Sequence, residues 1–263
     1  MKVFILKKIA ALLLAVLIMV TLSGCCPLVP VFKRFINADT DATSSTQQSD
    51  QMVEEIPEEP APDTSATVSI SRIDRSVTDS NGKVLVDFYY DQVFVSGTFE
   101  GVNKINAELV ADMTEFFSNQ GYIDELTSEA YLYDLFPFTC TRTAEISHND
   151  GGVLCVEFVS EWYMGGVFNS DLYPAVFDLN TGETPKLEDL TGKDRAYLEK
   201  ELKTKVSNFL VDYAGDSYAG TLATYSLEDF SYTIENGNIV IVFPSYEFTP
   251  ECFTVDTNIA VVK

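Results

Sequence analysis

Hydrophobic and polar residues alternate at the start of the folded region, which is the pattern of strands with one buried face. The first alternating run is TVSISRIDRSV, residues 67–77. The pair Asn81-Gly82 then predicts a tight turn, and residues 83–97 (KVLVDFYYDQVFVSG) are rich in the β-branched and aromatic residues typical of strands. We therefore expect two strands joined by a tight turn.

Two later segments carry apolar residues at steps of three and four, which is the spacing of one face of a helix. The first segment is expected to end at Gly121, and its apolar stripe consists of Val102, Ile105, Leu109, Met113, Phe116 and Phe117. The second covers roughly residues 194–213, and its apolar face consists of Ala196, Leu198, Leu202, Val206, Phe209, Leu210 and Tyr213. Both stripes are interpreted as core-facing.

The remaining ordered sequence reads as hairpins and single strands. Residues 137–147 and 152–164 predict one hairpin, and residues 227–243 predict another that turns at 235–238. Two further strands are expected, at 171–179 before a turn at 180–182 and at 253–262. The sum is an α+β fold of antiparallel β-hairpins packed with two main helices. We expect two related lobes, residues 67–160 and 161–263, in one compact unit.

The first 24 residues have the layout of a secretory signal, with a basic start, an apolar run over residues 9–22 and small residues before a cysteine. Leu22-Ser23-Gly24-Cys25 resembles a bacterial lipobox. The resemblance implies cleavage before Cys25 and a diacylglycerol on its sulfur, which would anchor the chain on the extracytoplasmic face of the cell membrane. An uncleaved anchor helix and ordinary secretion are the alternatives, although the apolar run is short for a membrane span.

Residues 25–66 predict a disordered tether. The segment is rich in Ser, Thr and Asp and continues into EEIPEEPAPD, so it cannot bury enough apolar surface to offset the entropy of ordering. A flexible chain of this length spans roughly 35 Å on average, and its like charges and prolines extend it further. The tether is therefore interpreted as a spacer between the membrane and the folded lobes.

The charge of the chain limits its partners. The first 24 residues hold three of the 17 basic residues and none of the 40 acidic ones, so the remainder carries 14 against 40, a net charge of −26. Nucleic acid and anionic lipid head groups are both attracted by basic surfaces, so neither is an expected partner. A negative field can instead steer a cationic partner, and it also suits a solvated surface without a specific ligand.

The residue types that most often carry catalysis or bind metal are sparse. His148 is the single histidine and is expected in a polar hairpin turn. That position does not suit a catalytic Ser-His-Asp triad or Cys-His dyad. Cys140, Cys155 and Cys252 lie in the folded region and allow at most one disulfide, with buried free thiols as the alternative. The spacing of these residues does not provide the four ligands of a structural zinc site. The sequence therefore identifies no catalytic residues, no metal site and no cofactor.

Aromatic and acidic residues gather in two stretches and predict a binding face. Such residues suit a wet recognition surface for a sugar or a protein. Trp162 and Tyr163 are neighbours in an expected strand, so they must face opposite sides. The candidate residues are Trp162, Tyr163, Phe168, Asp171, Tyr246 and Glu247. A rival reading uses paired carboxylates for glycan hydrolysis and draws on Glu157, Glu161, Asp171 and Glu247.

Three stretches resemble a known family. EWYMGG (161–166), YPAVFDLNTGETPKLEDL (173–190) and NIVIVFPSYEFTP (238–250) look like successive motifs of the domain of unknown function 3298. Residues 67–160 are similar to the module that commonly precedes this domain in peptidoglycan deacetylases of the PdaC type and lysozyme-sensing anti-sigma factors of the RsiV type. One departure is clear: Val167-Phe168-Asn169 follows the glycine pair, where relatives commonly have Ala-His-Pro.

The resemblance implies an extracytoplasmic module at the cell wall of a mostly Gram-positive family, which in RsiV-like proteins binds the basic protein lysozyme. We therefore expect a lipid-anchored binding or sensing protein of the bacterial cell envelope. Its expected partner is peptidoglycan or a cationic protein such as lysozyme. A glycan hydrolase and a structural lipoprotein without a tight ligand remain the alternatives.

Overall fold

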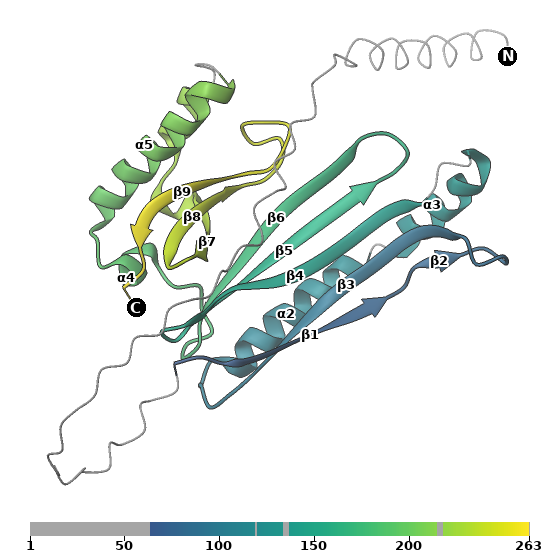
Figure 1. Ribbon diagram of the computed structural model, residues 1–263, viewed down its shortest axis with the longest axis horizontal. Helices are drawn as coiled ribbons and strands as arrows, with labels where there is room; N and C mark the ends of the chain where they lie inside the picture. The colour runs from purple at the N-terminus through teal and green to yellow at the C-terminus, as the bar shows by residue number, and fades with distance from the viewer. Residues whose placement is uncertain (1–63, 119, 134–136, 215–217, 263) are drawn as a thin grey trace, which may run out of the picture. The chain divides into compact units, whose positions relative to one another are not determined.

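The computed structural model describes residues 64–118, 120–133, 137–214 and 218–262, and all of them belong to one compact unit. The predicted signal segment, Cys25 and the tether up to residue 63 lie outside the described residues. Within the described residues the fold is α+β, as the sequence predicts, and it contains two sheets (Figure 1).

The larger sheet has six strands in the order β1-β3-β4-β5-β6, and β2 pairs with β3 beside this path. Its strands are β1 (Thr67–Asp74), β2 (Val77–Thr78), β3 (Val84–Ser96), β4 (Phe138–Asp150), β5 (Val153–Tyr163) and β6 (Phe168–Asp178). Neighbouring strands are antiparallel except β3 and β4, which run parallel. This parallel pair differs from the expected hairpins, because the long connection after β3 crosses back over the sheet before β4 begins.

That connection carries two helices, α2 (Val102–Phe117) and α3 (Gln120–Tyr133), which lie along one face of the larger sheet (Figure 1). The expected stripe of α2 is confirmed, since its members are buried in the larger core or packed against it. The expected end at Gly121 is wrong. Helix α2 already ends at Phe117, and Gly121 lies inside α3, which the sequence pattern did not predict.

The smaller sheet has three antiparallel strands, β7 (Ser231–Glu235), β8 (Asn238–Phe243) and β9 (Phe253–Ala260). Helix α5 (Arg195–Ala214) packs on it through the predicted stripe, in which Leu198, Leu202, Val206 and Leu210 are buried. Ala196 is exposed, so the stripe begins later than expected. Three short elements complete this part: α4 (Leu187–Thr191), α6 (Ala219–Thr224) and the 3-10 turn η2 (Leu227–Asp229).

The expected border between two lobes, at residues 160 and 161, falls inside β5. Strand β6 pairs with β5 along its whole length, and the chain leaves the larger sheet only after Asp178. The reason is the hairpin geometry, since a short turn after Tyr163 returns the chain antiparallel onto the same sheet. The stretch WYMGG therefore ends one strand of the larger sheet and begins the turn to its edge strand.

The two sheets contact each other around Thr233, which is fully buried on β7. Its hydroxyl oxygen lies 3.1 Å from the Cys155 sulfur and 3.1 Å from the Ser147 hydroxyl, and it donates to Glu157 Oε1 at 2.5 Å. Val153, Cys155 and Val176 of the larger sheet are part of the smaller sheet's core. Cys140, Cys155 and Cys252 are all free thiols, so the alternative without a disulfide is the one observed.

A cluster of carboxylates beside this contact predicts a pH-dependent stability. Burial raises the pKa of Glu235, and the neighbouring charges of Glu157, Asp256 and Glu145 raise it further. The folded state therefore disfavours the charged form, and this destabilisation begins above the unfolded pKa and is complete above the folded pKa. Replacing Glu235 by Gln should raise the melting temperature at pH 7 by about 2 °C, a small shift because solvent screens a partly exposed group.

The same substitution should have no effect at about pH 3.5, where the carboxyl is protonated in both states. Thermal unfolding of the Glu235→Gln variant at the two pH values, beside the exposed-site control Glu125→Gln, measures this difference. An equal gain at both pH values would contradict the electrostatic origin.

Candidate functional site

Strand β6 is an edge strand whose side chains alternate between two environments. Ala175 and Phe177 pack in or against the core beneath helix α2, whereas Val176 packs in the core of the smaller sheet. By the same alternation, Asn169, Asp171 and Tyr173 point to the α2 side of the sheet. This side of β6 carries Asp171, one of the predicted binding residues, and a pocket.

The structure divides the predicted binding residues of the β5–β6 hairpin. Trp162 pairs with Asn169, and Tyr163 pairs with Phe168, so Trp162 and Phe168 point to opposite faces. Trp162 is 39% exposed and Phe168 is 55% exposed. Tyr163 is half-buried against the larger core. Trp162 therefore lies on the side of Asp171, and Phe168 lies on the other.

The loop after β8 brings Tyr246 to this side. The backbone N–H of Ser245 donates to Asp171 Oδ1 at 2.7 Å, and the Tyr246 hydroxyl donates to Asn169 Oδ1 at 3.0 Å. Trp162, Asn169, Asp171 and Tyr246 together are called the aromatic face below. Glu247 is exposed in the same loop, and partial loss of solvent raises the pKa of its carboxyl.

Tyr246 has an unusual backbone. Its φ is +68°, a left-handed conformation that costs a non-glycine residue about 1–3 kcal/mol. The Tyr246 N–H donates to Thr249 O at 2.7 Å and the hydroxyl is held by Asn169, so the loop fixes this conformation. The ring is nevertheless 67% exposed. A strained backbone thus presents an aromatic ring to solvent in one orientation.

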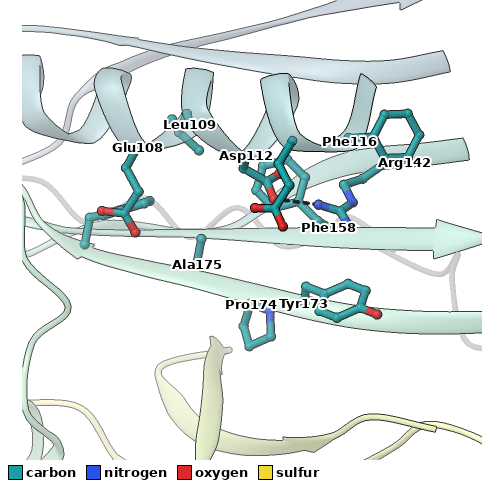
Figure 2. A pocket seen from close by; sticks show the side chains of 11 residues that line it. Glu108, Leu109, Asp112, Phe116, Arg142, Phe158, Tyr173, Pro174 and Ala175 are labelled. Atoms are coloured by element: carbon teal, nitrogen blue, oxygen red, sulfur yellow. Dashed lines mark hydrogen bonds and ion pairs between the residues drawn. The ribbon is translucent and has the colours of Figure 1, made fainter. Parts of the chain in front are cut away.

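A pocket of about 420 Å³ lies between helix α2 and strand β6 (Figure 2). Figure 2 shows Glu108 and Asp112 reaching from α2 toward β6, with Tyr173 and Pro174 on the opposite wall. Its lining is completed by Leu109, Glu115, Phe116, Arg142, Phe158, Ala175 and Phe177. We call it the α2–β6 pocket. It has the size of pockets that hold small ligands or single side chains.

A polar network forms one end of the pocket. Asp112 accepts a hydrogen bond from the Tyr90 hydroxyl at 2.5 Å and an ion-paired hydrogen bond from Arg142 at 2.6 Å. The Nε–H of Arg142 donates to the Ser160 hydroxyl at 2.7 Å. Burial, and then the Asp112 carboxylate, hold the pKa of Tyr90 far above its usual value, so the hydroxyl remains a donor.

The network connects to the aromatic face through Tyr173. The Arg142 guanidinium lies 5.1 Å from the centre of the Tyr173 ring, within the range of a cation–π contact. The Tyr173 hydroxyl lies 3.4 Å from Asp171 Oδ2, and burial followed by this carboxylate raises the Tyr173 pKa. Pocket and aromatic face therefore adjoin along one side of β6.

The hollow continues past the pocket. A second pocket of about 470 Å³ shares Glu108, Pro174, Ala175 and Phe177 with the first and extends to α4, η2 and β7. Arg195 lies in it and is paired with Glu228 and Glu188. Together the two pockets form a groove along the outer part of β6.

Two carboxylates of the rival hydrolytic reading, Glu161 and Asp171, lie on opposite faces of the sheet. Glu161 pairs with Ser170, whose neighbour Asp171 pairs with Ser160. Glu157 accepts the hydrogen bond from Thr233 at the sheet contact. His148 lies in strand β4 rather than in the turn, with its Nε2 3.2 Å from Asp150 O.

The residues of the α2–β6 pocket were missed by the sequence interpretation. A signal was present, because Glu108, Asp112 and Glu115 are spaced four and three residues apart and so share one side of the helix. Arg142 lies opposite these carboxylates because β4 pairs with both β3 and β5. No local sequence pattern indicates that pairing. Within the described residues, no helix has the length and apolarity needed to cross a membrane.

Two solved structures are similar to this chain. One is a member of the duf3298 family from Bacteroides fragilis NCTC 9343, with 12% identity over 76% of this chain and 95% of that chain and a TM-score of 0.45. The other is a DUF3298 family protein from Pseudomonas aeruginosa PAO1, with 13% identity over 76% of this chain and 94% of that chain and a TM-score of 0.45. Both carry the family name that the motifs in residues 161–250 resemble.

No family model matches the chain, and no curated protein is significantly similar to it. The two solved structures are too distant to support an argument about ligand, reaction or partner.

Proposed function

We propose that the chain is a lipid-anchored binding protein on the extracytoplasmic face of the bacterial cell envelope, and that it recognises a glycan component of the cell wall through the aromatic face. The anchor rests on the lipobox at Cys25 and the spacer on residues 25–66. The observation that carries the binding role is Tyr246, an exposed ring on a strained backbone held by Asn169.

Preorganisation of the Tyr246 ring favours binding. An exposed ring normally loses side-chain freedom when a ligand stacks on it, and this loss weakens binding. In Tyr246 the loop and the Asn169 contact have already fixed the ring, so less entropy remains to be lost. Trp162 adds a second exposed ring on the same side, and Asp171 supplies hydrogen-bond acceptors beside them. Aromatic rings flanked by such acceptors suit the apolar faces and hydroxyl groups of a sugar.

The net charge of −26 beyond residue 24 supports a second candidate, a cationic protein such as lysozyme. The two candidates differ in their response to salt, because screening weakens a charge-driven complex much more than ring stacking. Binding to lysozyme that falls steeply between about 0.05 and 0.5 M salt, without binding to wall glycan, would select the cationic protein.

Replacing Trp162 or Tyr246 by alanine should weaken binding to purified peptidoglycan sacculi about tenfold each, as expected for central aromatic contacts. Co-sedimentation of the full chain in mild detergent measures this affinity. Tyr197→Ala is the matched control, because Tyr197 is also exposed but lies on helix α5. Unchanged binding of both variants, or equal loss in the control, would count against the aromatic face.

A further inference from the structure

We infer that the α2–β6 pocket is a second binding site, which takes the alkylammonium group of a lysine side chain from a partner polypeptide. The inference does not depend on recognition of wall glycan. It rests on the shape of the cavity, on the charges that face it and on the groove into which it opens.

The cavity has the form that a lysine stem requires. Leu109, Phe116, Phe158 and Phe177 contribute apolar surface to its lining, and the volume of about 420 Å³ exceeds that of one side chain. A lysine stem buries its methylene groups against such surface while its ammonium group stays near polar atoms. A small hydrated metal ion would gain nothing from these walls. Within the residues that the structure describes, no three His, Cys, Asp or Glu side chains are grouped to hold a metal ion.

The charges that face the cavity are unbalanced. Three carboxylates line it, from Glu108, Asp112 and Glu115, against the single guanidinium of Arg142. Asp112 is engaged by Arg142 and Tyr90. For Glu108 and Glu115 the described residues provide no ion pair and no side-chain hydrogen bond. Like charges three or four residues apart on a helix repel each other, and a bound cation relieves this repulsion.

Arg142 does not supply the missing cation, because its guanidinium is already committed. It donates to Asp112 and Ser160, and its side chain is only 18% exposed. It also lies 5.4 Å from the centre of the Phe116 ring and 5.1 Å from that of Tyr173. Arg142 thus fixes one wall of the cavity, and the outer carboxylates are left facing the open space.

The length of the groove favours a lysine side chain of a polypeptide over a free amine as the ligand. The second pocket continues from the first along Pro174, Ala175 and Phe177, so the groove is longer than a single small amine. The loop after β8 covers the edge of β6 at Ser170 and Asp171, so the open part of the groove runs along residues 174–177. A segment lying along β6 would place one lysine side chain in the pocket between Glu108 and Tyr173.

The test uses a fluorescent tri-lysine peptide and the full chain in mild detergent. The peptide should bind saturably, and the double variant Glu108→Gln/Glu115→Gln should weaken this binding at least about tenfold. The matched control Glu100→Gln/Glu125→Gln removes two exposed carboxylates outside the pocket and should leave binding within about twofold. A peptide of acetylated lysines, which keeps the stems but not the charges, should not bind.

The outcomes separate the possible readings. Equal loss in the pocket and control variants would show non-specific attraction to an acidic protein and would overturn the inference, as would failure of the peptide to bind. Binding of cadaverine as tight as that of the peptide would overturn the polypeptide source and assign the pocket to free amines. Trp162→Ala should leave peptide binding unchanged, so failure of this site and failure of the aromatic face are distinguishable.

Discussion

Replacing Gly101 by alanine is expected to destabilise the folded chain by about 3–4 kcal/mol, a loss near the upper end of what single substitutions cause. Gly101 precedes helix α2, and its backbone lies against the turn after β6. A Cβ atom at this position would lie 2.3 Å from the Gly182 nitrogen and 2.6 Å from the Leu179 oxygen. Both distances are far inside van der Waals contact, and both partners are backbone atoms.

The neighbouring segments have no simple way to move apart. The Gly101 N–H donates to Leu179 O at 2.9 Å, so the close approach is also a hydrogen bond. The turn on the other side is held by the Gly182 N–H donating to Asp178 O at 2.8 Å, and Gly182 itself has a φ of +68°. Relief of the clash would therefore break one of these contacts or shift α2 against the sheet.

Urea unfolding followed by circular dichroism measures the loss directly. Gly121→Ala is the matched control, because an added Cβ there meets no atom within 4 Å and the residue lies in a helix. That control should be neutral or slightly stabilising, since alanine favours helix over glycine by up to about 1 kcal/mol. A Gly101→Ala variant as stable as the unchanged chain would show that the helix start can shift freely.

The same contact explains what the sequence could and could not predict. The turn residues Asn180-Thr181-Gly182 and the apolar stripe of α2 are local signals, and both elements were expected at about their observed places. Gly101 and Gly182 are far apart in the chain, and their contact produces no periodic pattern in the sequence. The local sequence alone identifies Gly101 only as a residue that precedes a helix.

The candidate site shows the same division. Alternation in β5 predicted that Trp162 and Tyr163 face opposite sides, and the register confirms it. The placement of Tyr246 beside Asn169 depends on how the loop of the smaller sheet crosses the edge of the larger one, which no pattern within either segment encodes. The α2–β6 pocket needs four elements at once, α2, β4, β5 and β6, so only its helical column of carboxylates had a local signal.

The network that ends this pocket is also expected to be a major source of stability. Replacing Asp112 by alanine should destabilise the fold by about 2–3 kcal/mol, because two polar groups lose their partner together. One is the hydroxyl of Tyr90, a fully buried residue, and the other is the guanidinium of Arg142, which is largely shielded from water. An unpaired donor in such a place loses its hydrogen bond without regaining one from solvent.

A double-mutant cycle isolates this cause. Arg142→Met removes the guanidinium while keeping an unbranched side chain, so Asp112→Ala combined with it should cost less than the sum of the two single changes by about 1–2 kcal/mol. Glu115→Ala, one turn along the same helix, is the matched control and should be nearly neutral, because the described residues give its carboxylate no partner. Strict additivity in urea unfolding would mean that Asp112 acts through packing rather than through its charge. Coupling of the expected size would instead establish that a charge pair between Asp112 and Arg142 builds this wall of the pocket.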